Sequence, residues 1–477
     1  MEDSRSPGVI IVGAGAAGIA TATRLLRNDF SNFIILEAQD RIGGRVFSKK
    51  FGNGMVDLGA QWCHGEERNI VYDLIKDYDV LKHDSSQFLP FQLQYSQTHF
   101  KGINESVNAE LTELFFQIYE QAQDTVEITS MGDYFSKYYV EAVETKYHDN
   151  QSLKQFALNA EVFFLHMIAS LEGTLSVYDV STGCSYEECK GDQMLTWNGK
   201  GFQTILDVLM NKFPNPDNPL PIGDKILFEK EVENIQWRND NKDGSVVVKC
   251  ADGSVYGGQY VVVTPSVGVL KAKVDEMFTP PLPIDKRRAV EDIGFGAIMK
   301  VFLLYEERWW SDNFKGCGFV WSEEDREVLR NKGDIWIMDI FYLFILESNP
   351  NVLCFFVSHD NVPSIEQKTD EEVLSGINFL IEKFLGDKYT PTTPSEILRS
   401  KWRSNPYFRG TYSYQSLKSH TSRTLINETL AAPICDNNSK PVVLFAGEAT
   451  HSVYYGTVHG AIETGFREAD RLLSLIK

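Results

Sequence analysis

The sequence predicts an α/β protein in which a parallel-sheet domain is interleaved with a second domain of mixed sheet and helices. The chain begins with "GVIIVGAGAAGIATATRLLRNDFSNFIILEA", which reads as strand, glycine turn, helix and strand. It ends on "VVLFAGEATHSVYYGTVHGAIETGFREADRLL", which reads as strand, turn and helix. Between them, "AIMKVFLLY", "DIWIMDIFYLFIL" and "VLCFFVS" read as strands of another sheet. A chain of 477 residues also exceeds what one hydrophobic core usually serves.

The domain boundaries are placed where this patterning changes. We expect the parallel-sheet domain to comprise residues 1–85, 196–290 and 416–477, because "VENIQW", "SVVVKC" and "YVVVTP" return the chain to strands. The second domain then comprises residues 86–195 and 291–415. Its first part is helical, as in "AELTELFFQIYEQAQ" and "QFALNAEVFFLHMIASL", and its second part is the mixed sheet.

Charge and cysteine content restrict the classes of partner. The chain has 66 acidic and 46 basic side chains and a net charge of −20, which argues against nucleic acid and favours a cationic ligand. Solubility is the alternative explanation of this acidity. The seven cysteines are scattered without the paired spacing of a zinc site, so we expect free thiols and no metal.

The location is expected to be cytoplasmic. The polar start "MEDSRSPG" lacks the layout of a secretory signal, and "LLSLIK" differs from the SKL-type peroxisomal signal. The most apolar run, Ile335–Glu347, is interrupted by Asp339 and is shorter than the roughly 20 residues of a membrane span. We therefore expect no membrane partner, and the sequence does not indicate an oligomeric state.

The first glycine turn predicts a dinucleotide site in a Rossmann-type domain. Gly13, Gly15 and Gly18 form G-x-G-x-x-G after the strand "VIIV", and Glu37 ends the next strand. The glycines let the backbone approach a pyrophosphate at the start of a helix, and the acid can accept a hydrogen bond from a ribose hydroxyl. An ordinary glycine-rich turn is the alternative explanation.

Three further motifs favour FAD over NAD. "RIGGR" offers two arginines, Arg41 and Arg45, that could meet the pyrophosphate charge. "DLGAQWCHG" follows it, and a pure NAD fold requires neither motif. Near the end, "FAGEATH" indicates a second glycine turn leading into a helix, whose start could face an electron-rich flavin ring.

Lys300 is the one charge in the run "FGAIMKVFLLY". Side chains alternate faces along a strand, so Lys300 shares a face with Phe302 and Leu304, and the opposite face carries Val301 and Leu303. Both faces are apolar, which predicts a buried lysine. A buried ammonium usually has a partner or a chemical role, the alternative being a lysine that snorkels to solvent.

Taken together, these motifs resemble the flavin-containing amine oxidases, most closely the animal-type polyamine oxidases, over nearly the whole chain. "WRSNPYFRGTYSY" and "VVVTPSVGVL" add to the likeness. The resemblance implies the amine oxidase fold and FAD that is held non-covalently. It implies cofactor contacts at the following positions: Gly13, Gly15, Ala17, Gly18, Glu37, Arg45, Gly59, Ala60, Gln61, Trp62, Val232, Glu448 and Thr457.

The same resemblance assigns catalytic roles. Lys300 would hold a water near the reactive flavin nitrogen, His64 would meet the substrate amine, and Tyr455 would shape the site. Tyr412 matches one wall of the aromatic pair of monoamine oxidases. The second wall falls at Thr457, which is not aromatic, and this departure favours a longer, flexible substrate.

Carboxylates for the distal ammonium groups of the substrate are sought in "YEECKGD". Glu187 and Asp192 are the candidates we select there, with Glu188 as a further one. A solvated acidic face is the alternative explanation of this run.

The expected activity is that of an FAD-dependent polyamine oxidase. Such an enzyme would oxidise a secondary amine of spermine or of N1-acetylated polyamines with dioxygen, giving a shorter amine, a three-carbon aldehyde and hydrogen peroxide. The choice between free and acetylated substrate stays open. A flavin-dependent histone demethylase, another amine oxidase and a non-catalytic FAD-binding protein are the alternatives.

Overall fold

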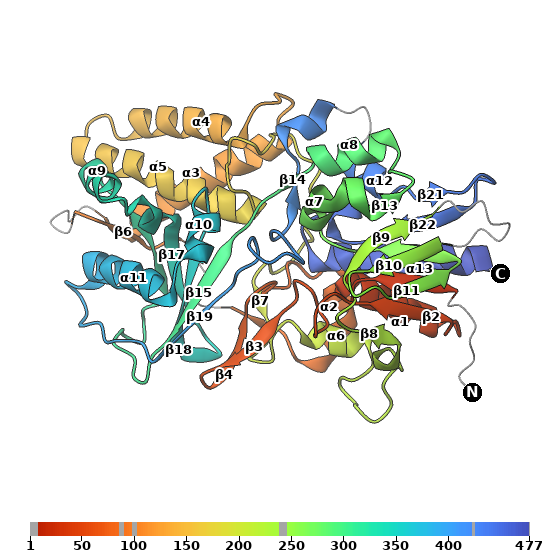
Figure 1. The fold of residues 1–477 in the computed structure, drawn as a ribbon. Helices are drawn as coiled ribbons and strands as arrows, with labels where there is room; N and C mark the ends of the chain where they lie inside the picture. Colours follow the sequence, from red (N-terminus) through yellow and green to blue (C-terminus); the bar gives the residue numbers. More distant parts are fainter. Residues whose placement is uncertain (1–7, 85–89, 98–102, 238–245, 422–424, 477) are drawn as a thin grey trace.

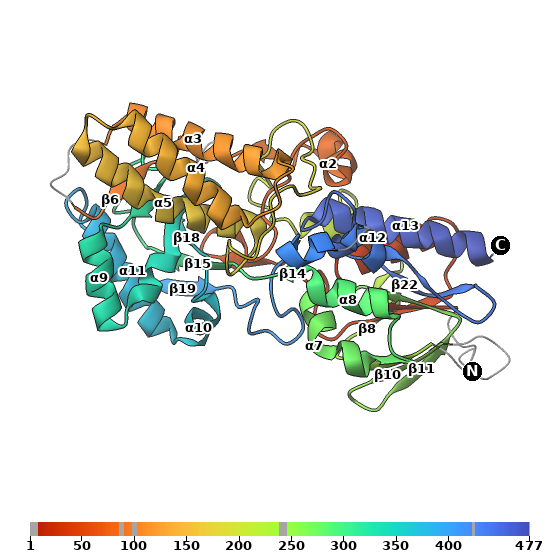
Figure 2. The same ribbon diagram turned by 90° about the horizontal axis from the view of Figure 1, so that it is seen from above.

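In the computed structural model, residues 8–84, 90–97, 103–237, 246–421 and 425–476 are described. Two sheets of six strands lie in separate halves of the molecule, each with its own helices (Figures 1 and 2). The chain leaves the first half after β5 (Lys82–His83), returns at β7 (Leu195–Thr196), and later makes the same excursion again. This confirms the predicted α/β class with two interleaved domains, whereas the exact boundaries stay a prediction.

The first half is built on a mainly parallel sheet. Its strands β1, β2, β8, β12 and β22 pair in parallel, and only the edge strand β21 is antiparallel. In spatial order they are β21 (Ile434–Cys435), β22 (Pro441–Phe445), β12 (Tyr260–Val263), β1 (Val9–Val12), β2 (Phe33–Leu36) and β8 (Ile226–Leu227). The chain goes from β1 to β2 on one side while β12 pairs on the other, so the order reverses at β1. Ligands of such sheets bind at the carboxyl ends of the strands at this point.

Other elements surround this sheet. Helix α1 (Ala16–Leu26) packs against α13 (Val458–Ile476), and α2 (Ile70–Ile75) and α6 (Thr204–Leu209) pack nearby. A second sheet consists of β11 (Val255–Gly258), β10 (Val246–Cys250), β9 (Val232–Gln236) and β13 (Phe278–Thr279). The remaining elements are β3 (Ser48–Phe51), β4 (Gly54–Asp57), α7 (Val267–Met277), α8 (Ile284–Asp292), α12 (Ile426–Ala431) and the 3-10 turns η1 (Lys76–Tyr78), η2 (Gly223–Lys225), η4 (Leu417–Thr421) and η5 (Glu448–Thr450).

The second half has a mixed sheet, as the sequence predicts. In spatial order its strands are β19 (Glu396–Arg399), β15 (Met299–Leu304), β18 (Asn349–Val357), β17 (Ile340–Leu346), β16 (Gly316–Val320) and β6 (Leu93–Tyr95). Only β16 and β6 are parallel. Its helices are α3 (Glu105–Asp124), α4 (Met131–Lys146), α5 (Gln151–Glu172), α9 (Glu323–Lys332), α10 (Val362–Gln367) and α11 (Asp370–Leu385).

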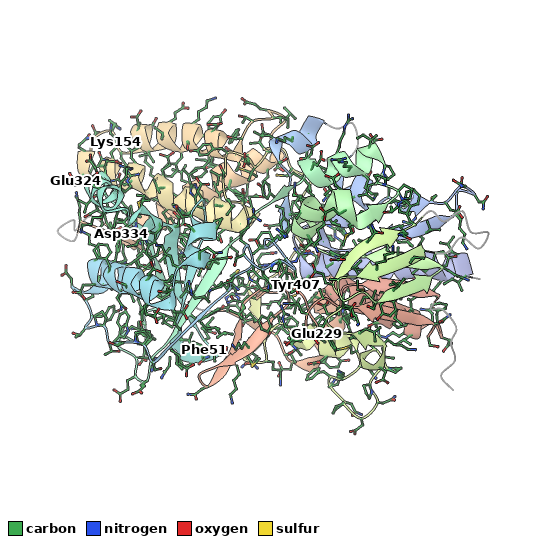
Figure 3. The ribbon with its side chains drawn as sticks, in the orientation of Figure 1. Phe51, Lys154, Glu229, Glu324, Asp334 and Tyr407 are labelled. Carbon is green, nitrogen blue, oxygen red and sulfur yellow. The ribbon has the colours of Figure 1, made fainter. Side chains whose placement is uncertain are left out.

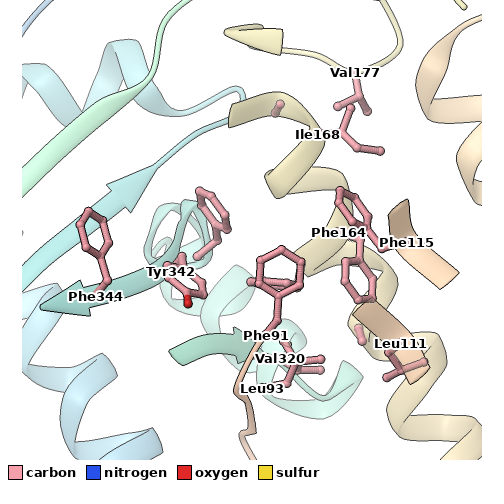
Figure 4. Packing of buried hydrophobic residues seen from close by; sticks show 14 of the residues in the cluster. Phe91, Leu93, Leu111, Phe115, Phe164, Ile168, Val177, Val320, Tyr342 and Phe344 are labelled. Carbon is pink, nitrogen blue, oxygen red and sulfur yellow. The ribbon is translucent and has the colours of Figure 1, made fainter. Parts of the chain in front are cut away.

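An aromatic core joins α3, α4 and α5 to this sheet. Phe91, Phe115 and Phe164 point toward one another in Figure 4, and the Phe115 and Phe164 rings stack with centroids 5.0 Å apart. Buried aromatic rings of this size bury large apolar areas and prefer such offset contacts. Helix α5 is thereby packed against β16 and β17 of the sheet, which matters for the side chains that it presents.

Lys300 lies in β15, and both faces of that strand are buried as predicted. Phe302 belongs to the aromatic core, whereas Val301 and Leu303 belong to the separate core under α10 and α11. The strand is shorter than the sequence indicates. The run from Phe295 to Tyr305 is divided between β14 (Gly294–Phe295), which pairs with β20 (Ser413–Tyr414), and β15.

Two other expectations about elements are wrong. The run "DIWIMDIFYLFIL" is strand only in its second part, because Ile335–Asp339 forms the 3-10 turn η3 before β17. The turn after β22 does not lead directly into a long helix. Gly447, at φ +129°, is followed by the short turn η5, and α13 begins only at Val458. The start of the long helix therefore lies at Val458 and not directly after "FAGEATH".

Candidate active site

One large cavity lies between the two halves and collects most of the predicted site residues. Its volume is about 1160 Å³, larger than the 300–1,000 Å³ or so of ordinary ligand pockets. Figure 3 shows Tyr407, one of its lining residues, between the two halves. The lining includes these predicted residues: Gly13, Gly15, Ala17, Glu37, Arg45, Gly59, Ala60, Gln61, Trp62, His64, Val232, Lys300, Tyr412, Glu448, Tyr455 and Thr457.

The glycine turn after β1 brings bare backbone to this cavity. Gly13 has φ +103°, and α1 begins directly after Gly15. Gly18 does not line the cavity, but a Cβ on it would lie 2.0 Å from the carbonyl oxygen of Gly13. The third glycine therefore permits close packing of helix on turn, and the first two leave the N-terminus of α1 open toward the cavity.

Glu37 lies at the carboxyl end of β2 and is 7% exposed. Its Oε2 accepts a hydrogen bond of 2.7 Å from the backbone N–H of Ala14, and its Oε1 one of 2.9 Å from Gln39 N–H. Burial raises the pKa of this carboxyl although these two donors oppose the rise. The carboxylate is thus fixed at the cavity wall, where a ribose hydroxyl can reach it.

The two arginines of "RIGGR" have different environments. Arg45 lines the cavity, and its Nη1 donates to Glu448 Oε1 at 2.9 Å and to the Thr411 carbonyl at 2.5 Å. Arg41 instead donates to the Gly44 carbonyl and its guanidinium lies 4.0 Å from the Phe47 ring centroid. Arg41 therefore stabilises its own loop, and only Arg45 is placed to meet a bound anion.

Glu448 connects four segments rather than presenting a free carboxylate. Besides the contact with Arg45, its Oε2 accepts hydrogen bonds from Ser413 Oγ at 2.6 Å and from Gly456 N–H at 2.9 Å. Thr457 is similarly engaged, because its hydroxyl donates to the Tyr454 carbonyl and accepts from Gly460 N–H at the start of α13. Both residues line the cavity and hold its wall in shape.

Lys300 is 3% exposed and is surrounded by acceptors. Its Nζ donates to the carbonyls of Asp57 and Gly59 at 3.0 and 2.9 Å and to Gln61 Oε1 at 2.7 Å. Burial, which disfavours the charged form, lowers its pKa to about 8. Gly59 has to be glycine in this arrangement, because a Cβ there would lie 1.8 Å from the Arg45 carbonyl oxygen.

His64 lines the same cavity, and a hydrogen bond fixes the role of one of its ring nitrogens. Its Nδ1 lies 2.7 Å from the carbonyl oxygen of Gln193. A carbonyl only accepts, so Nδ1 carries the hydrogen, and Nε2 of the neutral ring is an acceptor. Burial lowers the pKa of this histidine, which favours that neutral form.

Aromatic rings line the part of the cavity near α5. Tyr412 donates to the Ser170 carbonyl at 2.5 Å, and the rings of Tyr186 and Tyr455 meet edge to face at 5.5 Å. In another part of the cavity, beside Lys300, Trp62 packs against Phe356 with ring centroids 5.9 Å apart. These walls suit an alkyl chain that carries positive charges.

The acidic residues of the cavity are not the ones selected from the sequence. Glu187 is exposed and lies 3.4 Å from Arg68, Asp192 Oδ2 contacts His83 Nδ1 at 2.6 Å, and neither lines the cavity. Glu120, Glu172 and Glu188 line it instead. Sequence reasoning missed Glu120 and Glu172, because they lie on different helices and no motif marks them.

Burial raises the pKa of Glu172, and partial burial together with the charge of Glu120 raises the pKa of Glu188. The Glu172 carboxylate accepts a hydrogen bond of 2.6 Å from the hydroxyl of Tyr119. Within the described part of the chain none of the three forms a salt bridge with a basic side chain. A cationic ligand would relieve this accumulation of negative charge.

Comparison with known proteins is consistent with this geometry. The family described as "Flavin containing amine oxidoreductase" matches residues 16–473. A human protein named peroxisomal N(1)-acetyl-spermine/spermidine oxidase is 32% identical, covering 98% of this chain and 95% of its own length. Its bovine counterpart is 30% identical over 99% and 95%. A solved putrescine oxidase variant is 17% identical and superimposes with a TM-score of 0.68 over 98% of both chains, which shows the shared fold.

The residues of the cavity fit FAD. The backbone at Gly15 is left bare, and a Cβ on Gly44 would lie 3.3 Å from the Gly15 Cα, so side chains are excluded where the two loops approach. Arg45 and the N-terminus of α1 supply positive charge for a pyrophosphate, and Glu37 supplies the acceptor for a ribose.

Within the described ranges, no helix has the length and apolar character needed to cross a membrane.

Proposed function

Because the chain belongs to the flavin-containing amine oxidoreductases, and is thus an FAD-dependent amine oxidase, we propose that it is a polyamine oxidase. Its substrate is a flexible polyamine such as spermine or an N1-acetylated polyamine. The human and bovine relatives support this class by name, and the absence of an aromatic ring at Thr457 supports a long substrate rather than an arylalkylamine.

The observation that carries the proposal is the continuity of the cavity. The same volume contains the Rossmann-type glycines, Lys300 and His64, and the aromatic and acidic walls. A substrate amine near Lys300 can therefore have its distal ammonium groups at Glu172 and Glu188, with the connecting alkyl chain against the aromatic rings.

His64 positions the reacting amine in this proposal. Nε2 of the neutral ring is an acceptor, so a neutral secondary amine can donate its N–H to it. The lone pair of the substrate nitrogen then remains available while electrons leave the neighbouring carbon atom. Tyr455 and Tyr412 restrict the path of the alkyl chain.

The reaction balances as one amine, one dioxygen and one water giving an aldehyde, a shorter amine and hydrogen peroxide. When bound, FAD would supply the two-electron acceptor for the amine and a route for these electrons to dioxygen. Lys300 holds a water, and the imine of the substrate is hydrolysed to the three-carbon aldehyde and the shorter amine.

Free spermine is expected to be the better substrate. An unacetylated terminus keeps its ammonium, which the carboxylates of Glu172 and Glu188 can accept, whereas an acetamide carries no charge to offset them. Turnover of spermine and N1-acetylspermine, compared as kcat/KM, measures this preference. A higher value for the acetylated substrate would reverse it without affecting the enzyme class.

The enzyme class is tested by anaerobic reduction. The purified yellow protein is mixed with spermine without oxygen, and we expect the flavin absorbance to bleach. NADH and tyramine are the controls and should leave it unchanged. If no polyamine, free or acetylated, reduces the flavin, the proposal is wrong.

The cytoplasmic location stays a prediction beside this proposal, because the human and bovine relatives are named peroxisomal. Microscopy of the tagged chain, with the tag at the N-terminus, distinguishes the two compartments.

A further inference from the structure

A group of three metal-ligating side chains lies in the mixed-sheet half, outside the cavity. His166 comes from α5, Asp339 from the end of η3, and His359 follows β18. Their ligand atoms all lie within 4.8 Å of one another, and within the described ranges no other such group of three occurs. His166 and Asp339 are about 5% exposed, and the His359 side chain is 25% exposed.

The hydrogen bonds of this group place two acceptors opposite each other. His166 Nδ1 lies 2.7 Å from the Val162 carbonyl oxygen and must donate to it, so Nε2 of the neutral ring carries a lone pair. That Nε2 faces Asp339 Oδ1 at 3.3 Å. The other carboxylate oxygen, Oδ2, accepts from Asn361 N–H at 3.0 Å. A cation between Nε2 and Oδ1 would interact favourably with both acceptor atoms.

A metal ion explains more of the arrangement than a proton does. A proton would satisfy His166 and Asp339 alone, yet the His359 ring also lies there, with its centroid 5.0 Å from that of His166. Ligands of a tetrahedral zinc ion with bonds of about 2.0 Å lie roughly 3.3 Å apart, and the Nε2–Oδ1 distance is 3.3 Å. The other ring nitrogen, His166 Nδ1, and the other carboxylate oxygen, Asp339 Oδ2, are hydrogen-bonded to backbone groups. Such contacts usually orient metal ligands.

We propose that His166, Asp339 and His359 bind one first-row divalent transition metal ion, with Zn²⁺ the best match. Two imidazoles and one carboxylate are the ligand types that zinc accepts, whereas Mg²⁺ and Ca²⁺ prefer oxygen ligands alone. The partly exposed side of His359 provides the route of entry and room for a water ligand.

The position of the site gives the ion a structural consequence. Ser358 Oγ donates to the His166 carbonyl at 2.8 Å, and Ser358 N–H donates to the Asp339 carbonyl at 3.1 Å, so α5 and the sheet already meet here. The next residues of α5, Met167, Ser170 and Leu171, line the active-site cavity. The bound ion therefore fixes the helix that forms one wall of the cavity.

The sequence does not indicate this site. His166 and Asp339 are 173 residues apart, and only the packing of α5 on the end of η3 brings them together. The scattered spacing that argued against a metal applies to ligands on one hairpin or helix, and these ligands lie on three separate elements.

The test is zinc titration of the purified FAD-loaded protein after treatment with a chelator. Calorimetry should find one tight equivalent of Zn²⁺ per chain. His359→Ala and Asp339→Asn should each weaken it at least about tenfold, as loss of a ligand does. His148→Ala and Cys435→Ser are the controls, because both side chains are exposed and neither belongs to the group of three, and they should leave the tight equivalent unchanged.

A second readout separates the site from adventitious binding. One equivalent of Zn²⁺ should raise the thermal unfolding midpoint of the wild type but not of His359→Ala, and the same amount of Mg²⁺ should have no effect. Since His359 is partly exposed, its alanine variant is expected to fold even if Asp339→Asn does not. Absence of a tight equivalent in the wild type, or unchanged affinity in His359→Ala, would overturn the proposal.

Discussion

Lys300 has as many acceptors around it as its ammonium has hydrogens. Asp57, Gly59 and Gln61 each accept one bond, so the charged form has no donor left for a water. The neutral amine has two N–H groups and a lone pair, and it can accept a hydrogen bond from a water. The protonation state of Lys300 thus decides whether it can bind a water.

Replacement of Lys300 tests its role in the chemistry. Lys300→Met keeps the apolar stem in β15 and removes the nitrogen, so FAD should remain bound while amine oxidation slows by about 10²-fold. The flavin absorbance of the purified variant and stopped-flow rates of reduction and reoxidation measure the two effects separately. Lys49→Met, at an exposed position in β3, is the matched control. Unchanged rates in Lys300→Met would remove the lysine from the mechanism.

The pH dependence of turnover follows from the same side chain. Burial lowers the pKa of Lys300 to about 8, so the amine is mostly charged below that pH and mostly neutral above it. If the neutral amine holds the water, kcat at saturating polyamine should rise as the pH increases through about 8 and then level off. The titration of the substrate amine can also contribute, and Lys300→Met separates the two. The rise should vanish in that variant, and identical profiles would refute the assignment.

Two adjacent glutamates provide a matched test of substrate binding. Both side chains are exposed, but Glu188 lines the cavity, whereas Glu187 lies outside it beside Arg68. Glu188→Gln should raise the KM for spermine severalfold, since one charge-assisted contact contributes about 1 kcal/mol or more. Glu187→Gln should leave KM unchanged, and kcat should change little in either variant. Equal KM values in the two variants would place the distal ammonium elsewhere.

At the scale of single elements, the turn between β1 and α1 depends on its glycines. Alanine normally stabilises a helix relative to glycine by about 1 kcal/mol. At Gly18, however, the added Cβ would lie 2.0 Å from the Gly13 carbonyl oxygen, and backbone cannot yield as a flexible side chain does. The clash therefore outweighs the gain in helix propensity, and the turn has to shift.

Gly18→Ala should purify with much less bound FAD than the wild type, measured as the ratio of flavin to protein absorbance. Gly223→Ala is the control, because a Cβ there meets nothing within 4 Å and its φ is not in the left-handed region. Full retention of FAD in Gly18→Ala would show that the turn tolerates the displacement.

Elements with local signals are the ones that the sequence predicts correctly. The strand of Val9–Val12, the glycine turn and Glu37 follow one another within a short segment, so their spacing alone defines the unit. The strand predicted around Lys300 is longer than the observed one. Gly296 breaks it, because that residue packs so closely on Gly173 that a Cβ would lie 2.4 Å from its carbonyl oxygen. This contact between distant segments leaves no local signal.

At the scale of the whole molecule, the site exists only because the two halves meet. Lys300 and His64 were predictable from motifs, since each lies in a recognisable run. Glu120 and Glu172 were not, because α3 and α5 bring them to the cavity and neither helix carries a mark of function. The conspicuous acids of "YEECKGD" attracted attention instead, and two of them, Glu187 and Asp192, contact Arg68 and His83.

The net charge of −20 predicts how salt affects the enzyme. An acidic protein attracts a polycation over a distance, and this attraction is screened as the Debye length falls from about 8 Å at physiological ionic strength to about 3 Å in molar salt. We therefore expect kcat/KM for spermine to fall steadily as sodium chloride is added, while kcat stays nearly constant. N1-acetylspermine carries one charge fewer, so its kcat/KM should fall less steeply under the same conditions. Steady-state rates of both substrates across a salt series measure the two slopes. Slopes of zero for both substrates would mean that the acidity serves solubility and does not guide the substrate.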